Sequence, residues 1–376
     1  MSRNLKRRLL LPLITSLSVA IALTGFVSAN AVASSNVDPL LLAPTTAISY
    51  QARYSQTLVK TPISKGKLSM PYSHVLPLRA GPIGDPNRVY TFCMSQALTG
   101  STWAVAQQES VMIEAARHSN VKVYYYNTAN DPLKQVENLE TCIVQKVDAI
   151  LVWPHSVAAL TPMVEKIKKL GIKIVGMERT VSTRNYDSWV YLDNAKATAD
   201  VAAAVCAKLG NKGTVAETDG ALGSSPQILR RSGFVDALAE KCPNVKVVFT
   251  SPTDYSRGQG YKVATDFLQS PQGKNIDAWY DQYTEIGFGI HQALIDAKRT
   301  DIPQFSIVDG KNAVQAVLDG VFFAVAPWTP VHGDVALRAA ILLVTKKKVP
   351  KDILLAQPPI ITKSNAADAL RQTWVG

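Results

Sequence analysis

From Val89 onward, short apolar runs alternate with longer segments in which apolar residues recur at helical spacing. Each apolar run ends in small or polar residues. The runs predict strands at Val89–Ser95, Val121–Tyr126, Ala149–Trp153, Lys173–Met177, Trp189–Leu192, Thr214–Thr218, Val245–Thr250, Ala278–Tyr280 and Phe305–Val308. The intervening segments predict helices, among them Trp103–His118, Leu133–Gln145, Ala158–Leu170, Ala195–Leu209, Gln227–Lys241 and Gly258–Leu268.

This alternation predicts an α/β fold. Strands that are almost entirely apolar and that alternate with helices are typical of parallel sheets covered on both faces. The strands are too many for one small sheet, so we expect two sheets, each with its own helices. Ligands of such sheets bind beyond the carboxyl ends of the strands, and the residues just after each strand are therefore the first candidates for a site.

The first 33 residues have the pattern of an export signal. A basic start with four cations and no acids precedes an apolar stretch from Leu9 to Val27, and small-x-small sites end at Ala31 and Ala33. We expect cleavage near one of these two residues and export to the periplasm; an uncleaved membrane anchor is the alternative. Removing residues 1–33 lowers the formal net charge from +11 to +7.

Residues 34–87 form a proline-rich arm that differs from the rest of the chain. It holds seven of the 21 prolines, with Asp38 and Asp85 as its acids. Because proline fixes φ and removes a hydrogen-bond donor, a regular helix or a central strand is excluded here. Two interpretations stay open: an extended arm that lies on the main body, or a partly disordered leader.

The four cysteines, Cys93, Cys142, Cys206 and Cys242, have no C-x-x-C spacing, and the five histidines are scattered. A zinc site therefore has little support, and we expect no metal. In an oxidising compartment two disulfides are possible, with three connectivities allowed by counting. Their order along the chain suggests the pairs Cys93–Cys142 and Cys206–Cys242; the alternative is four buried thiols.

Enzymatic motifs are not matched. Gly258-x-Gly260 lacks the third glycine of a dinucleotide fingerprint, and the chain has neither a phosphate-binding P-loop nor a G-x-S-x-G nucleophile turn. The sequence shows no nucleophile that would act together with His155 or His291. We expect no cofactor and no catalysis. The charge excess of the mature chain is modest, and its one tight run, Lys346–Lys348, is typical of a solvated helix end, so nucleic acid is not an expected partner.

The residues found at the strand ends share a different chemistry. They combine carboxylates and guanidinium groups, which make strong hydrogen bonds to hydroxyl groups, with aromatic rings on which the apolar face of a sugar can lie. The set comprises Ser95, Trp103, Asn130, Glu178, Arg179, Arg230, Tyr255, Asp281 and Asp309. This combination favours a site for a small polyhydroxylated solute.

These residues belong to motifs that resemble the ribose/galactose-type periplasmic binding proteins, whose core is shared with the ligand domain of LacI-type repressors. The resemblance runs from about Val89 to the C-terminus. The matching segments are Val147–Pro154 ("VDAIIv-P"), Gly171–Val175 followed by Glu178-Arg179 ("GIPVV…DR"), Arg230–Phe234 ("R-x-x-G-F"), Asp254–Arg257 ("D-F-D-R") and Ile307–Gly310 ("v-G-f-D-g"). No helix-turn-helix pattern precedes the core, so a repressor is not expected.

The resemblance implies a type I periplasmic binding protein: two Rossmann-like lobes with parallel sheets, joined by three crossovers near Leu192, Pro327 and Gln357. Lobe I would comprise 88–192 plus 328–357, and lobe II 193–327 plus 358–376. The family's ligand contacts fall on Ser95, Trp103, Glu178, Arg179, Arg230, Tyr255, Asp281 and Asp309, with Trp328 beside them. Glu178 stands where the family usually has Asp, and Pro327 where it has Gln.

The expected function is that of a periplasmic substrate-binding component of an ABC importer, which takes a sugar or sugar-like polar solute between its lobes by hinge closure. The alternative is a ligand-binding partner of a sensor kinase or chemoreceptor. The arm at 34–87 and the pair Cys93 and Cys142 resemble periplasmic sensor partners of the trimethylamine-oxide-responsive kind, which supports that alternative.

Overall fold

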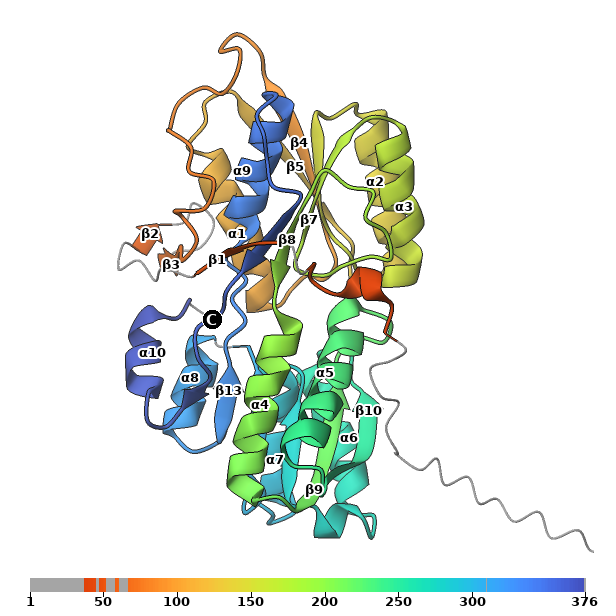
Figure 1. Cartoon of the computed structure of the whole chain (residues 1–376), viewed down its shortest axis with the longest axis vertical. Coiled ribbons are helices and arrows are strands. Elements are labelled where there is room, and N and C mark those ends of the chain that lie inside the picture. The colour runs from red at the N-terminus through yellow and green to blue at the C-terminus, as the bar shows by residue number, and fades with distance from the viewer. Residues whose placement is uncertain (1–36, 45–46, 52–57, 61–66, 309, 375–376) are drawn as a thin grey trace, which may run out of the picture. The chain divides into compact units, whose positions relative to one another are not determined.

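The computed structural model describes residues 37–44, 47–51, 58–60, 67–308 and 310–374 (Figure 1). The expected signal peptide with its cleavage sites, and Asp309 of the candidate site, lie outside the described residues. Among the residues that are described, no helix is both long and apolar enough to cross a lipid bilayer.

The first sheet has seven strands in the order β1-β14-β8-β7-β6-β4-β5, and every neighbouring pair is parallel. Its strands are β1 Ile48–Tyr50, β4 Tyr90–Gln96, β5 Val121–Asn127, β6 Ala149–Trp153, β7 Lys173–Met177, β8 Ser188–Leu192 and β14 Asp352–Leu355. The helices packed on it are α1 Thr102–Ala115, α2 Pro132–Val144, α3 Val157–Lys169 and α9 Gly333–Val344.

Alternate residues of these strands face opposite layers of helices, as the period of two in a strand requires. Met94 of β4 packs in one core cluster with Val111 of α1 and Leu337 of α9. Its neighbour Cys93 packs in a second cluster with Leu139 of α2, which also includes side chains of α3. The sheet is therefore buried on both faces, with α1 and α9 on one side and α2 and α3 on the other (Figure 1).

The second sheet has six strands in the order β10-β9-β11-β12-β13-β15, parallel except for β15, which runs antiparallel to β13. Its strands are β9 Gly213–Asp219, β10 Val245–Pro252, β11 Ala278–Asp281, β12 Gln304–Ile307, β13 Ala324–Ala326 and β15 Ile361–Thr362. The helices that follow or precede them are α4 Asn194–Leu209, α5 Ser225–Lys241, α6 Arg257–Leu268, α7 Thr284–Asp296, α8 Lys311–Leu318 and α10 Ala366–Gln372.

The chain passes between the two sheets three times: from β8 to α4, from β13 to α9, and from β14 to β15. These passages lie at the positions expected from the sequence, and the α/β fold with two lobes is confirmed. The residue boundaries of the two lobes stay a prediction. All nine predicted strands and all six named helices occur, with their ends shifted by three residues or fewer.

The described parts of the proline-rich arm lie on the main body, which favours the first of the two interpretations. The short strand β1 adds to the edge of the first sheet beside β14, and β2 Leu58–Lys60 pairs with β3 Lys67–Ser69. The buried Arg338 of α9 donates to the carbonyl oxygens of Tyr72 and Val75, both at 2.9 Å. A buried guanidinium thus ties the arm to a core helix.

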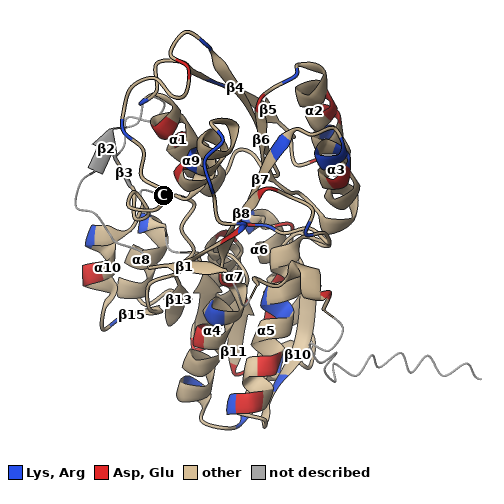
Figure 2. Ribbon diagram, turned by 45° about the horizontal axis from the view of Figure 1, so that its top comes forward, with Lys and Arg blue, Asp and Glu red and all other residues tan. Residues whose placement is uncertain are grey.

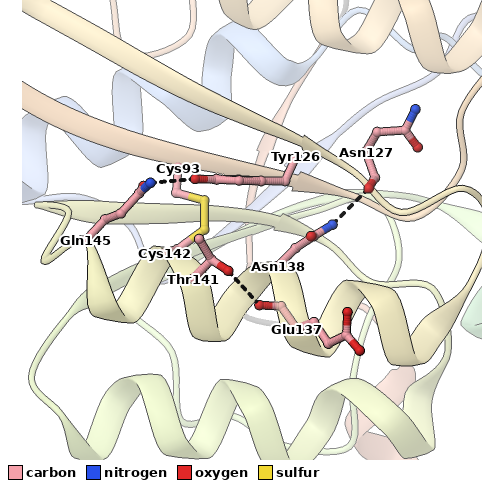
Figure 3. The surroundings of a disulfide bond; sticks show 8 residues. All are labelled: Cys93, Tyr126, Asn127, Glu137, Asn138, Thr141, Cys142 and Gln145. Carbon is pink, nitrogen blue, oxygen red and sulfur yellow. Dashed lines mark hydrogen bonds between the residues drawn. A yellow bond between two sulfur atoms is a disulfide. The ribbon is translucent and has the colours of Figure 1, made fainter.

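Both expected disulfides are present. Cys93–Cys142 joins β4 to α2 with a Cα–Cα distance of 6.0 Å (Figure 3), and Cys206–Cys242 joins α4 to the end of α5 with 5.8 Å. Both distances lie in the usual range for such bonds. Each bond links a helix to the element beside it within one lobe.

The basic excess of the chain is dispersed. In Figure 2, Lys or Arg positions occur together with Asp or Glu positions on α3, α4, α5 and α10. On α3, for example, Lys166 pairs with Glu140 of α2 at 2.5 Å, and Lys168 pairs with Asp187 at 2.8 Å. This interspersion of both signs is that of an ordinary solvated surface.

Candidate functional site

A cavity lies where the carboxyl ends of the strands of both sheets meet. Six of the nine predicted site residues line it: Trp103, Glu178, Arg179, Arg230, Tyr255 and Trp328. The space between the lining side chains, counting the part open to solvent, is about 360 Å³. The part that a water-sized sphere can occupy is only about 40 Å³, far below the roughly 300 to 1,000 Å³ usual for small-molecule sites, so the cavity is small in this arrangement of the lobes.

Glu178 is the central group of the cavity. It follows β7 with φ of +59° and is 3% exposed. Its Oε2 accepts a hydrogen bond from the indole Nε1 of Trp153 at 2.6 Å, and its Oε1 accepts one from Nε1 of Trp328 at 3.0 Å. Two guanidinium groups approach the same carboxylate, Arg179 at 3.8 Å and Arg230 at 3.9 Å. These donors and cations offset the cost of burying the charge.

Arg179 is held against the first lobe with donor capacity left over. Its NH1 donates to the carbonyl oxygen of His155 at 2.8 Å, and its guanidinium lies over the rings of Trp153 at 4.9 Å and Tyr255 at 5.5 Å. Its buried Nε has no hydrogen-bond partner within the described part of the chain. Burial lowers the pKa of the Arg179 guanidinium, which nevertheless keeps its proton because arginine is so strongly basic.

Arg230 enters the cavity from α5 of the second lobe. Its Nε donates to Oδ1 of Asn194 at 3.1 Å, and its NH1 donates to the carbonyl oxygen of Gln282 at 2.6 Å. The guanidinium carbon lies 4.4 Å from the centre of the Trp328 ring. Two fixed hydrogen bonds and one ring therefore set the direction in which its remaining NH2 points.

Three indoles form one wall of the cavity. The rings of Trp103 and Trp153 are 4.9 Å apart, and Nε1 of Trp103 donates to the carbonyl oxygen of Trp328 at 2.9 Å. Behind Trp103 lies the fully buried His332, whose ring centre is 5.9 Å away. Burial lowers the pKa of His332 to about 4, so this imidazole is neutral at physiological pH.

Two phenols, Tyr255 and Tyr283, also line the cavity. Tyr255 has φ of +59°, and its ring meets that of Tyr283 edge to face at 5.8 Å. Gly220 allows this placement, because a Cβ at that position would lie 1.9 Å from the Tyr255 ring. Burial raises the pKa of the Tyr283 phenol, which therefore stays neutral and can donate a hydrogen bond.

Three other strand-end residues, Ser95, Asp281 and Asn130, do not line this cavity. Ser95 is fully buried in β4, and Asp281 at the end of β11 accepts a hydrogen bond from Ser306 of the neighbouring strand β12. Burial raises the pKa of Asp281 well above the ordinary range of a carboxyl. Asn130 is exposed and braces a loop by accepting from the Thr99 N–H at 2.9 Å. Asp309 is outside the described residues, but Val308 before it lines the cavity.

Sequence reasoning missed Trp153, Tyr283 and Ser101, which also line the cavity. Trp153 is the last residue of an apolar strand and has the pattern of a core residue. The one available signal was its position: like Glu178, it stands at the carboxyl end of a strand in the same sheet.

The two lobes touch at the rim of the cavity. The Val157 N–H at the start of α3 donates to the carbonyl oxygen of Gly223 at 3.1 Å, and the Thr180 N–H donates to Oγ of Ser225 at 2.8 Å. Both bonds join a residue of the first lobe to the loop or helix start that follows β9. The structure thus shows the cleft in a closed arrangement.

Comparison with known proteins gives a family match over more than half of the chain. The family described as "Periplasmic binding protein domain" matches residues 92–348. A xylitol-binding protein of Mycolicibacterium smegmatis is 28% identical over 256 residues, which are 68% of this chain and 72% of the relative. A ribose import binding protein of Bacillus subtilis is 28% identical over 265 residues, 70% and 85% of the two chains.

Solved structures share the fold. The binding component of an arabinose ABC transporter from Shewanella sp. ANA-3 superposes with a TM-score of 0.70 at 22% identity, covering 74% of this chain and 94% of that one. A solute binding protein from Mycobacterium smegmatis with bound glycerol superposes with a TM-score of 0.69 at 26% identity, covering 77% of this chain and 99% of that one. The family match spans more than half of the sequence, and the same two-lobed fold encloses the cavity. This chain belongs to the periplasmic binding protein family.

Proposed function

We propose that this chain binds one small sugar-like solute between its two lobes, leaves it chemically unchanged, and delivers it to an ABC importer. The observation that carries the proposal is the convergence of Glu178, Arg179 and Arg230 in one aromatic-walled cavity. These groups come from two lobes, so a ligand that touches all of them bridges the cleft.

The chemistry of the cavity suits a polyhydroxylated molecule. Each hydroxyl group both donates and accepts, and the charged partners Arg179, Arg230 and Glu178 make the stronger kind of hydrogen bond. The rings of Trp103 and Tyr255 offer flat apolar surface to the carbon skeleton. The small size of the cavity suits a single ring or a short polyol better than an oligosaccharide.

We propose Trp103, Glu178, Arg179, Arg230, Tyr255 and Trp328 as ligand contacts, with Asp309 as a further one because it adjoins Val308. Ser95 and Asp281 are not proposed as direct contacts. Relatives named for xylitol, ribose and galactofuranose binding support a ligand of this class. They do not agree on one compound, so the class is proposed rather than a particular sugar.

We place the working protein in the periplasm, after cleavage of residues 1–33 near Ala31 or Ala33. The leader pattern supports this location, and so do the two disulfides, since such bonds form and persist in oxidising compartments. Hinge closure around the ligand changes the outer face of the two lobes together. A membrane permease can therefore distinguish loaded protein from empty protein.

A sensor kinase or chemoreceptor is the second candidate partner. The fructose-binding periplasmic domain of a hybrid two-component system has the same fold, with a TM-score of 0.71 at 24% identity, covering 75% of this chain and 94% of that domain. Closure of the same cleft would then signal instead of delivering cargo. An importer predicts a neighbouring permease and ATPase gene, and a sensor predicts a kinase gene.

A thermal-shift screen of pentoses, hexofuranoses, polyols and small amine oxides tests the proposal. We expect at least one sugar or polyol to raise the melting temperature of the wild type, and the Arg230→Ala variant to lose that shift. Stabilisation by amine oxides alone would favour the sensor-type alternative, and turnover of any compound would contradict a pure binding role.

A further inference from the structure

Thr180 joins three parts of the molecule. It directly follows the site residue Arg179, and its backbone N–H donates across the cleft to Oγ of Ser225. Its side-chain Oγ1 donates at 3.0 Å to the carbonyl oxygen of Leu41 in the proline-rich arm. One residue of the ligand-site loop is therefore bonded at the same time to the second lobe and to the arm.

The arm is ordered where it meets this loop. Asp38 accepts from the Leu40 N–H at 2.9 Å and begins the single turn Pro39–Leu41. Leu41 is 3% exposed, although it lies in a segment that has no sheet partner. Ala43, two residues later, packs against the core cluster that contains Trp189. The contact with Thr180 is thus part of a buried junction and not a lone surface bond.

The other end of the same arm is fixed at a crossover between the lobes. Strand β1 pairs with β14, and the Ala356 N–H just beyond β14 donates to the carbonyl oxygen of Tyr50 at 2.7 Å. The Tyr72 hydroxyl donates to the carbonyl oxygen of the same Ala356 at 2.9 Å. Both backbone groups of this crossover residue are therefore bonded to the arm.

We propose that the described parts of the arm, residues 37–44 and 47–51, act as a latch that stabilises the closed cleft. Its base is fixed at Ala356, and its tip holds the Glu178–Thr180 loop in the position from which the Thr180 N–H reaches Ser225. Loss of the bond to Leu41 loosens Thr180 at the end of this loop and weakens its cross-cleft contact with Ser225. The latch rests on the proposed function in one respect, namely that the cleft opens and closes, but its test requires no ligand.

Hydrogen exchange of backbone amides measures the opening directly. The Val157 N–H is bonded across the cleft to Gly223, far along the chain from the arm, and it exchanges only when the lobes separate or the protein unfolds. In the variant Thr180→Val the N–H to Ser225 is kept and only the hydroxyl that bonds Leu41 is removed. We expect the Val157 amide to exchange about fivefold faster, the factor that one lost neutral hydrogen bond gives.

Thr183→Val is the matched control. Thr183 lies three residues further along the same loop, and its hydroxyl donates to Glu165 of α3, within the first lobe. This variant loses the same group without touching the arm, so the Val157 amide should keep its wild-type exchange rate. Leu41→Gly, which removes the buried side chain at the tip of the latch, should accelerate Val157 as Thr180→Val does.

The opposite results would overturn the latch. If Thr180→Val speeds exchange of the Leu41 amide while Val157 is unchanged, the arm is merely attached to a lobe that closes without it. If neither amide changes, the bond from Thr180 to Leu41 contributes nothing to closure. A failed ligand screen, by contrast, would count against the proposed function and would leave these exchange rates as they are.

Discussion

Glu178 and Trp328 are hydrogen-bonded to each other, Oε1 to Nε1 at 3.0 Å, although they lie 150 residues apart. Glu178 follows β7 of the first sheet, and Trp328 lies in the crossover between β13 and α9. The bond therefore connects the ligand-site loop to a segment that joins the two lobes. Because Trp153 donates to the other oxygen of the same carboxylate, one acid positions two of the three indoles that line the cavity.

We expect Glu178→Gln to lower the free energy of unfolding by about 3 kcal/mol, because it leaves Arg179 and Arg230 buried without their carboxylate. Urea unfolding of the ligand-free protein measures this cost. Glu285→Gln is the control: Glu285 pairs with Arg257 at 2.9 Å on the surface, where such a pair is worth about 1 kcal/mol or less. Equal costs for the two variants would show that Glu178 has no organising role.

We expect Arg230→Ala to weaken ligand binding more than about tenfold. The variant loses a charged hydrogen-bond donor that lies beside the Trp328 ring and the Glu178 carboxylate. Calorimetric titration with the best compound of the screen gives the change. Arg257→Ala is a close match outside the cavity, because Arg257 also lies over an aromatic ring, that of Phe288 at 4.9 Å, and also pairs with a glutamate. If Arg230→Ala binds the ligand as tightly as Arg257→Ala does, Arg230 is not a ligand contact.

The two disulfides should leave no free thiol in denatured protein purified from the periplasm. They close loops with sequence separations of 49 and 36 residues, for which the chain-entropy relation gives about 4 kcal/mol each. We expect the double replacement of Cys206 and Cys242 by Ser to lower the free energy of unfolding by up to that amount. Four reactive thiols in the denatured wild type would contradict the pairing.

The buried His332 should make stability fall as the solution becomes acidic. Its Nδ1–H donates to the Thr329 carbonyl oxygen, and its Nε2 accepts from Gln107, both at 3.1 Å, so protonation of Nε2 breaks a bond. The pKa is about 4 when folded and about 6.5 when unfolded, so the unfolded state binds the extra proton between these values. The contribution of neutral His332 to the free energy of unfolding is therefore fully present above pH 6.5. It declines by about 3 kcal/mol as the pH falls towards 4.

Urea unfolding at several pH values compares the wild type with His332→Gln, which cannot titrate. The slope of the free energy of unfolding between pH 6.5 and 4 should be smaller in the variant. Identical slopes for the two proteins would mean that His332 is protonated as readily in the folded state as in the unfolded chain.

The fold was largely predictable because each buried strand is a compact apolar run bounded by small or polar residues. The strands that escaped prediction are short ones: β1, β2, β3, β13, β14 and β15 have two to four residues each. Strand β1 was not predictable from its own sequence, because it forms by pairing with β14. The prolines excluded a central strand in the arm, and β1 is indeed at the edge of its sheet, but they could not indicate that the arm lies on the body.

The sequence shows which polar residues stand at strand ends, but not which of them line the cavity. Glu178 and Asp281 both follow apolar strands, yet the first faces the cavity and the second faces Ser306 on the neighbouring strand. Which side a strand-end residue takes depends on the local backbone, such as the positive φ of Glu178, and the sequence does not display it. Trp153 was missed because an aromatic residue at the end of a buried apolar strand is typical of the hydrophobic core.

Native mass spectrometry of the mature protein, mixed with the best ligand of the screen, tests the central claim most directly. We expect one ligand per chain, released on denaturation with its mass unchanged, and no bound ligand in the double variant Arg179→Ala/Arg230→Ala at the same concentration. Equal occupancy in the double variant, or a ligand recovered with an altered mass, would contradict a closing cleft that holds its solute without transforming it.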